Sequence, residues 1–287
     1  MFDLVLGIIF FNVLLVLFKF FDRFGVDNMS AITVNYFVAG ILGFYFSDFD
    51  TGYKEIIESD WLVYALTTSF FFVTSFILVA KGSQKIGMAI TTVANKMSLV
   101  VPVIFAFILL GDSLNWIKMV GICVALISVY LATTNGQKLS FDKKYIPVIL
   151  YIFLGQGLAD ASFNYATIKH VGEENSQLFL CIIFLGSGII GLLLMVYRII
   201  ASKLKLHWNA IIWGIALGVP NYLTLFYFLR ALDSGILESS QFYPIFNMGV
   251  IVLSALIGFL FFKEKLSLRN WLGISLSILA IAAISLA

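Results

Sequence analysis

Lys96 is a charged residue inside a long apolar stretch of the chain, with Thr92, Asn95 and Ser98 as polar neighbours. It lies near the middle of the apolar segment 86–110, so roughly 15 Å of helix separates it from either end. A charge at the centre of a bilayer costs about 2.5–3.5 kcal/mol on insertion scales, and a lysine at this depth does not readily reach an interface. The position predicts a substrate or coupling site or, alternatively, a structural ion pair that fixes helix packing.

The predicted partner of Lys96 is a carboxylate in a second apolar segment, 145–168. Gln156, Asp160 and Asn164 are spaced four residues apart there, which puts them on one face of a helix. Such a polar stripe must face protein or a water-filled cavity and not lipid. Hydrogen bonding between helices is an equal alternative for Asn164. For Asp160 we expect a role in the site.

Two prolines inside apolar segments predict local weaknesses in the helices that carry further polar residues. Pro220 lies in GVPNYL, and Pro244 lies in QFYPIFN. A proline removes a backbone donor and can kink a helix, and broken helices offer free backbone groups to a ligand. The remaining residues of the predicted site are Thr92, Asn95, Asn12, Asn221, Tyr222, Gln241, Tyr243 and Asn247.

Three carboxylates lie at or near segment ends and receive different predictions. Glu238 lies within a turn of the start of 236–262, where it can reach the interface as a solvated charge. Asp112 and Glu264 lie in tight turns beside the next helix start, where a carboxylate favours the positive helix N-terminus. We predict that Asp112 and Glu264 are structural caps.

Long apolar segments must position all of these residues. The chain is 61% hydrophobic and 12% charged, whereas a soluble domain is about 45–50% apolar and about 25% charged. A membrane helix needs about 20 mostly apolar residues. The sequence therefore predicts an all-α, polytopic membrane protein of ten transmembrane helices, with no separate soluble domain. The ten segments are 3–21, 29–47, 61–80, 86–110, 114–134, 145–168, 176–200, 209–231, 236–262 and 267–286.

A polar linker, 135–144, divides the chain into two five-helix repeats, 1–134 and 145–287. An odd number of helices per half inserts the halves with opposite orientation, which is the inverted-repeat plan of many transporters. LLGDSLNWIKMVGI at 109–122 resembles FFKEKLSLRNWLGI at 261–274, at an offset of 152 residues. The same offset pairs Asn12 with Asn164 and Asn95 with Asn247.

Lysine and arginine in the connections predict the orientation. Thirteen follow the odd-numbered segments: Lys19, Arg23, Lys81, Lys85, Lys138, Lys143, Lys144, Arg198, Lys203, Lys205, Lys263, Lys265 and Arg269. Four lie on the opposite side: Lys54, Lys118, Lys169 and Arg230. We predict that both termini lie outside. The first segment has no preceding basic residue and is retained rather than cleaved. The expected location is a bacterial inner membrane.

The motifs GDSLNWIKMVG and KEKLSLRNWLG each carry an acidic turn, a leucine, and an aromatic residue and a glycine that open the next helix. With the ten-helix plan, they make the chain resemble the EamA-type transporters of the drug/metabolite transporter superfamily. The resemblance implies a central cavity, alternating access and small metabolites as substrates, often amino acids. The first half departs from the usual pattern, since GDS replaces a glycine–glutamate pair and Lys96 occupies the fourth helix.

We therefore predict a secondary active transporter of a small metabolite, amino-acid-like or another organic anion, and not an enzyme. Lys96 would be a fixed charge for an anionic group, or would form a pair with Asp160 that substrate or proton breaks. A channel and a non-transporting membrane scaffold are the alternatives. Expected partners are the substrate, the lipid bilayer, and protons or a counter-substrate, with the chain a monomer or homodimer. The chain contains no HExxH, paired CxxC or phosphate-binding glycine loop, so we expect no metal, cofactor or nucleic acid.

Overall fold

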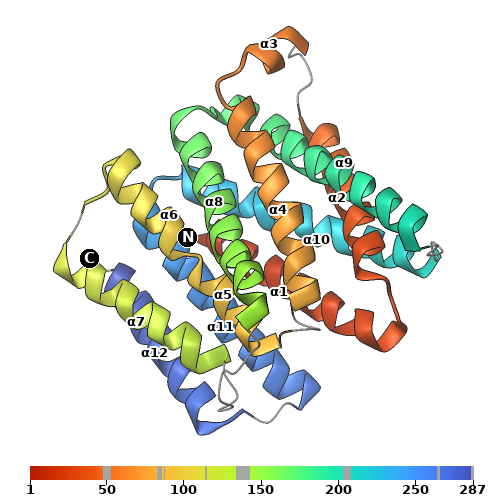
Figure 1. The fold of residues 1–287 in the computed structure, drawn as a ribbon. Helices are drawn as coiled ribbons and strands as arrows, with labels where there is room; N and C mark the ends of the chain where they lie inside the picture. Colours follow the sequence, from red (N-terminus) through yellow and green to blue (C-terminus); the bar gives the residue numbers. More distant parts are fainter. Residues whose placement is uncertain are drawn as a thin grey trace. The chain divides into compact units, whose positions relative to one another are not determined.

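The computed structural model describes residues 1–47, 53–82, 86, 88–113, 115–133, 143–202, 208–263 and 266–285. These residues form helices and connections and contain no strand, so the predicted all-α class is confirmed (Figure 1). The helices are α1 Phe2–Phe24, α2 Asn28–Phe46, α3 Tyr53–Glu58, α4 Leu62–Gly82, α5 Met88–Met97, α6 Val100–Phe105, η2 Ala106–Leu110, α7 Trp116–Thr133, α8 Ile146–Lys169, α9 Ser176–Ser202, α10 Trp208–Asp233, α11 Ser239–Phe262 and α12 Leu268–Ser285.

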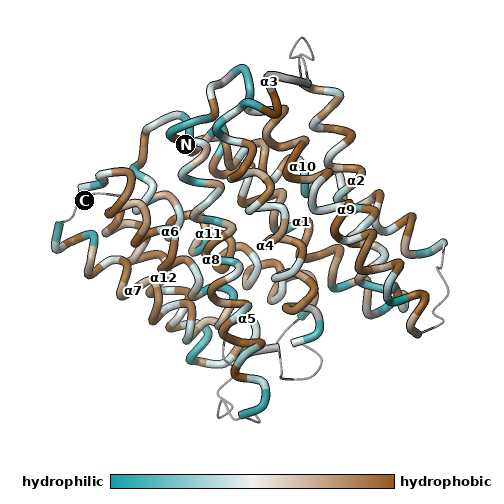
Figure 2. Tube along the Cα trace, turned by 45° about the horizontal axis from the view of Figure 1, so that its top comes forward, coloured by the Kyte–Doolittle hydropathy of each residue, from teal (hydrophilic) through white to brown (hydrophobic). Residues whose placement is uncertain are grey.

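Eight spans in the described part of the chain are long and apolar enough to cross a membrane. They correspond to eight of the ten predicted segments, and the other two form the shorter apolar helices Trp116–Ala132 and Leu268–Ile284. Figure 2 shows apolar residues along the helices, with hydrophilic residues gathered at helix ends and connections. A multi-pass membrane protein is the architecture that this pattern supports. The short helix α3 lies in a polar stretch that sequence reasoning treated only as a connection.

The connection between α1 and α2 is a compact turn closed by side chains. Gly25 adopts a left-handed conformation with φ of 60°, and Asp27 caps α2 by accepting hydrogen bonds from Ser30. Arg198 donates to Asp27 at 3.0 Å. Partial burial opposes ionisation of Asp27, but the bonds from Ser30 and the charge of Arg198 outweigh it and lower the pKa of the carboxyl. Asp27 thus joins α1, α2 and α9 at one helix end.

The described chain divides into two compact units. Unit 1 contains Met1–Thr74 and Ser162–Asp233, and unit 2 contains Ser75–Ala161 and Ser234–Ala287. The division falls inside α4 and α8, so each of these helices contributes to both units. Each unit therefore combines segments from the first and second halves of the sequence.

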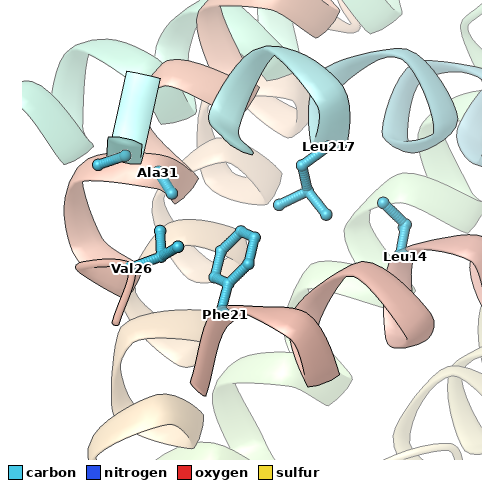
Figure 3. Packing of buried hydrophobic residues seen from close by; sticks show 6 residues of the cluster. Leu14, Phe21, Val26, Ala31 and Leu217 are labelled. Carbon is cyan, nitrogen blue, oxygen red and sulfur yellow. The ribbon is translucent and has the colours of Figure 1, made fainter. Parts of the chain in front are cut away.

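Unit 1 is held together by close apolar packing. In it α2 packs against α9 and α10, and α1 packs against α10. One buried cluster, seen in Figure 3, consists of Leu14, Phe21, Val26, Ala31, Ala210 and Leu217. Because lipid tails are as apolar as these side chains, van der Waals fit rather than removal from water stabilises such contacts.

Unit 2 is built around the pair α7 and α12, with α11 packed against both. Two glycines set the distance between α7 and α12. A Cβ atom at Gly121 would lie 2.6 Å from Cγ1 of Ile284, and one at Gly273 would lie 2.3 Å from the backbone nitrogen of Ala132. Only glycine permits so close an approach of the two helices. The two contacts correspond at an offset of 152 residues, because Gly121 corresponds to Gly273 and Ala132 corresponds to Ile284. The glycine lies on α7 in the first contact and on α12 in the second.

Candidate functional site

The helix that carries Lys96 is interrupted directly after it. Residues 86–110 were predicted as one transmembrane helix, and the span Thr91–Leu110 corresponds to it, although the structure divides it into three helical pieces. Pro102 has no N–H for the carbonyl of Ser98, which instead accepts from the backbone of Val101 at 2.9 Å. The hydroxyl of Ser98 turns back to the carbonyl of Asn95. As a result α5 ends at Met97, α6 starts at Val100, and a π-helical turn, η2, follows.

Lys96 is half-buried, and its ammonium contacts α11. The Nζ atom donates to Oδ1 of Asn247 across 3.4 Å, a distance longer than an ordinary hydrogen bond of about 2.9 Å. The Nδ2 atom of Asn247 in turn donates to the carbonyl of Tyr243 at 3.0 Å. The amide of Asn247 is thereby oriented with its oxygen toward the lysine.

The same region of α11 is tied to α8. The hydroxyl of Tyr243, itself 2% exposed, donates to the main-chain oxygen of Asp160 at 2.8 Å. Nε2 of Gln156 donates to Oδ1 of Asp160 at 3.0 Å. Oε1 of Gln156 accepts from Nδ2 of Asn95 at 3.4 Å, which returns the network to α5.

These contacts close a ring of six residues on α5, α8 and α11, all within unit 2. We refer to Asn95, Lys96, Gln156, Asp160, Tyr243 and Asn247 as the polar ring. Sequence reasoning had selected every one of them. Buried polar groups that satisfy one another in this way form a rigid and specific arrangement.

The polar ring contains one basic and one acidic side chain that interact electrostatically, Lys96 and Asp160. Oδ1 of Asp160 accepts one hydrogen bond, whereas Oδ2 accepts none from the described residues. A ligand group with a donor or positive charge can therefore meet this oxygen, and an anionic group can meet Nζ of Lys96. Across the described ranges, no group of three or more His, Cys, Asp and Glu residues could hold a metal ion. The ring thus offers one basic and one acidic side chain to which charged groups can bind.

The other predicted site residues of unit 2 lie near the ring but outside it. Thr92 is half-buried on α5, one turn before Lys96. Gln241 is 8% exposed, and both ends of its amide are engaged. Its oxygen accepts from the backbone of Glu238 at 3.0 Å, and its nitrogen donates to the carbonyl of Ile284 at 2.8 Å. The amide of Gln241 therefore joins the start of α11 to the end of α12.

Four predicted site residues lie in unit 1: Asn12, Asn164, Asn221 and Tyr222. Asn12 and Asn164 are each 1% exposed, and Asn221 is half-buried. Nδ2 of Asn12 donates to the carbonyl of Ile8 at 2.8 Å, while its Oδ1 is buried and accepts no hydrogen bond from the described residues. The hydroxyl of Tyr222 donates to Gln177. Their membership of a ligand site remains a prediction.

Sequence reasoning missed a second buried lysine, Lys118. It was counted as a charge in a connection, and that assignment is wrong. Lys118 lies in the first turn of α7, is 0% exposed, and pairs with Oε2 of Glu238 at 2.6 Å. Burial opposes ionisation of Glu238, but hydrogen bonds from Lys118 and Ser113 outweigh it and lower the pKa of the carboxyl. Glu238 is thus an anchored carboxylate at the start of α11.

A sequence signal for this arrangement existed. Glu238 and Gln241 have the spacing of a capping box, and the structure contains that box at the start of α11. Asp112 also serves α11, because its Oδ2 accepts from the backbone of Ser240 at 2.7 Å. The prediction that Asp112 is a cap is therefore right in kind, although the capped helix is not the next one along the chain. Glu264 lies outside the described residues.

Comparison with known proteins gives a family match for the first half of the chain and a similar fold for the whole chain. The model of the EamA-like transporter family matches residues 2–134. A Haemophilus influenzae relative, described as an uncharacterized protein, is 26% identical over 262 residues, covering 89% of this chain and 84% of its own length. A solved structure, described as a crystal structure of a protein, has a TM-score of 0.79 at 12% identity, with 99% of this chain and 96% of that chain covered. That likeness concerns the fold alone.

The family match confirms the predicted resemblance for the first half of the chain. The apolar spans independently support a multi-pass membrane protein.

Proposed function

Starting from a chain whose first half matches the EamA-like transporter family, we propose that the protein is a secondary active transporter of a small charged metabolite. The polar ring is the substrate or coupling site, with Lys96 and Asp160 as its charged groups. The substrate is amino-acid-like or another organic anion. Transport proceeds by alternating access and is driven by protons or by a counter-substrate.

The observation that carries the proposal is the way Lys96 is held. Its ammonium lies in an apolar span, Thr91–Leu110, and reaches a neutral amide oxygen at 3.4 Å. Asp160 interacts with Lys96 electrostatically, and an intramembrane pair of ionisable side chains is typical of a substrate or coupling site. Asp160 offers the complementary oxygen on the facing helix. A ligand can therefore enter the ring without leaving a protein charge unpaired.

The proposed alternating access needs two inverted five-helix repeats, 1–134 and 145–287, within ten transmembrane helices. The contacts of Gly121 with Ile284 and of Gly273 with Ala132 support this plan, because one offset of 152 residues relates them. The same offset relates Asn95 to Asn247, and both belong to the polar ring. A site built from equivalent positions of two repeats is typical of transporters and favours them over a channel or a scaffold.

We also propose that both termini lie outside a bacterial inner membrane. Thirteen basic residues follow the odd-numbered segments and four lie on the opposite side, which is a positive-inside bias. The chain acts as a monomer or homodimer.

A binding screen followed by a flux assay tests the function. Purified protein is screened by thermal shift with L-glutamate, L-serine, L-lysine, succinate, inorganic phosphate and glucose 6-phosphate. A ligand at 100 times its Kd stabilises the folded state by about 2.7 kcal/mol. The stabilising solute is then measured by counterflow in proteoliposomes. We expect saturable counterflow, which a scaffold does not give; flux that never saturates would instead indicate a channel.

The matched variants are Lys96→Met and Lys169→Met. Lys169 is an exposed lysine in the last turn of α8, so its substitution tests for general effects of losing a charge. We expect Lys96→Met to abolish counterflow and Lys169→Met to leave it unchanged. Counterflow at the normal rate in Lys96→Met would overturn the assignment of the polar ring.

A further inference from the structure

The start of α11 is bound to a second polar cluster of unit 2, which the proposed function does not use. We call Asp112, Ser113, Lys118, Glu238 and Ser240 the anchor. We propose that Lys118 and Glu238 are positioning residues that fix the first turn of α11, and so hold Tyr243 and Asn247 against Asp160 and Lys96. The inference rests on the proposed function only where it takes the polar ring as a substrate or coupling site; the geometry of the ring is independent of that assignment.

Lys118 makes a complete set of contacts inside the protein. Its Nζ donates to the carbonyl of Ser113 at 2.8 Å, to the hydroxyl of Ser113 at 3.1 Å and to Glu238 at 2.6 Å. An ammonium has three protons to donate, and the side chain is 0% exposed. Lys118 therefore joins Ser113, in the turn after η2, to Glu238, which directly precedes α11.

Glu238 and Asp112 complete the attachment from both sides of the turn. Glu238 also accepts from the backbone of Ser113 at 2.9 Å and from its hydroxyl at 2.8 Å. Asp112 accepts from the backbone of Ser240 at 2.7 Å. The turn that ends the α5–η2 segment, which carries Lys96, is thereby joined to the start of α11, which carries Asn247.

The first turn of α11 needs this external support because of Pro244. A proline has no N–H, so the carbonyl of Ser240, four residues earlier, lacks its normal partner in the helix. Tyr243 lies in the same weakened turn, and its hydroxyl bonds to the main chain of Asp160 at 2.8 Å. Tyr243 and Asn247 follow Glu238 by about 7.5 and 13.5 Å along the helix axis, at a rise of 1.5 Å per residue. A shift of the first turn would therefore displace both residues of the ring.

The anchor is a permanent feature and not an opening contact. Separating the pair would leave the ammonium of Lys118 buried without its carboxylate, which is strongly unfavourable. Glu238 is 38% exposed, so its own charge is partly hydrated, but Lys118 has no such compensation. This asymmetry favours positioning over a gate that must break in every cycle.

The test measures the geometry of the polar ring without any ligand. Wild-type protein and the double variant Lys118→Met/Glu238→Gln receive a short pulse of acetic anhydride, and acetylation of Lys96 is quantified by mass spectrometry. Removing both partners avoids leaving one charge buried alone. Amide hydrogen exchange of residues 239–248 is measured on the same samples.

Asn270→Ala is the matched control. Asn270 is 1% exposed in unit 2, and its Nδ2 donates to the carbonyls of Leu131 and Ala132. It therefore joins the start of α12 to the end of α7, and neither of these bonds involves an anchor residue. If loss of the anchor only destabilises unit 2, labelling of Lys96 should rise equally in the double variant and in Asn270→Ala.

We expect acetylation of Lys96 to rise about tenfold in the double variant, as the loss of a hydrogen bond to a charged group implies, and to stay unchanged in the control. Exchange across 239–248 should rise in parallel. Equal Lys96 labelling in wild type and double variant, or an equal rise in Asn270→Ala, would overturn the inference. If the double variant does not fold, Ser113→Ala removes two contacts of the anchor and is judged by the same readouts.

The two proposals fail separately. Counterflow of Lys96→Met decides whether the polar ring transports, whereas labelling of Lys96 decides whether the anchor positions it.

Discussion

Lys96 and Lys118, two lysines in the described part of unit 2, are held in different ways. Lys118 is 0% exposed and lies 2.6 Å from a carboxylate, with two further bonds to Ser113. Lys96 is half-buried and lies 3.4 Å from the neutral amide of Asn247. Lys118 donates all three of its ammonium protons inside the protein and so serves the fold. Lys96 lies in the polar ring beside Asn247 and Asp160, and we propose that it serves a ligand.

The largest expected effect on stability follows from Glu238→Gln. It leaves the ammonium of Lys118 buried without a charged partner. We expect a loss of about 3 kcal/mol in the free energy of unfolding, at the low end for a broken buried pair because Glu238 is partly exposed. Unfolding in mixed detergent micelles measures the loss. Glu58→Gln, at an exposed glutamate of α3, is the control, and an equal effect there would remove the distinction between the two lysines.

A second prediction gives Lys96 an adjacent carboxylate, as Lys118 has in Glu238. Asn247→Asp keeps the acceptor oxygen that Lys96 contacts and adds a negative charge. We expect counterflow of the stabilising solute to fall about tenfold, because the new carboxylate competes with an anionic ligand for the ammonium of Lys96. Stability should stay within about 1 kcal/mol, since the new ion pair offsets the lost amide bond to Tyr243. Asn247→Ala is the control, and faster counterflow in Asn247→Asp than in Asn247→Ala would contradict the prediction.

The smallest expected effect is a pH dependence confined to the Lys118 site. The folded pKa of Glu238 is lowered from its usual value of 4.5, so its contribution to stability is present above that pH. The contribution is lost as the pH falls through the lowered folded pKa. Thermal midpoints of wild type should therefore decline more on acidification than those of Glu238→Gln. Asp27 has a lowered pKa in both proteins, so parallel curves would show that Glu238 adds nothing to acid sensitivity.

Depth and spacing made the polar ring predictable. Asp160 and Gln156 share a helix face at four-residue spacing, and Lys96 lies among apolar residues. Placing such polar groups in a membrane is energetically unfavourable, so each was expected to have a polar partner. The ten apolar segments likewise correspond to helices because length and hydropathy determine insertion. The exact bonds were not predictable, since they depend on which helices meet. Even so, the choice of residues needed no tertiary information.

Lys118 and the break after Lys96 were missed for different physical reasons. Lys118 lies at a helix start, where a lysine usually reaches water, and only the approach of Glu238 from 120 residues away makes burial tolerable. The break after Lys96 had a local signal in Pro102, but the mean hydropathy of the segment does not respond to one proline. The burial of Lys118 could be found only from a tertiary contact, whereas the break could have been predicted from the missing N–H of Pro102.

The polar ring also has a consequence for biosynthesis. Asn95 meets Gln156 across 61 residues and Lys96 meets Asn247 across 151, so their partners do not exist when the first of them leaves the ribosome. At about 5–20 residues per second, Lys96 waits roughly 8–30 seconds for Asn247. During that interval an ammonium sits in an apolar segment with no partner from α11. The nascent chain must therefore be held at the insertion machinery, or Lys96 kept near the interface, until α11 has been made.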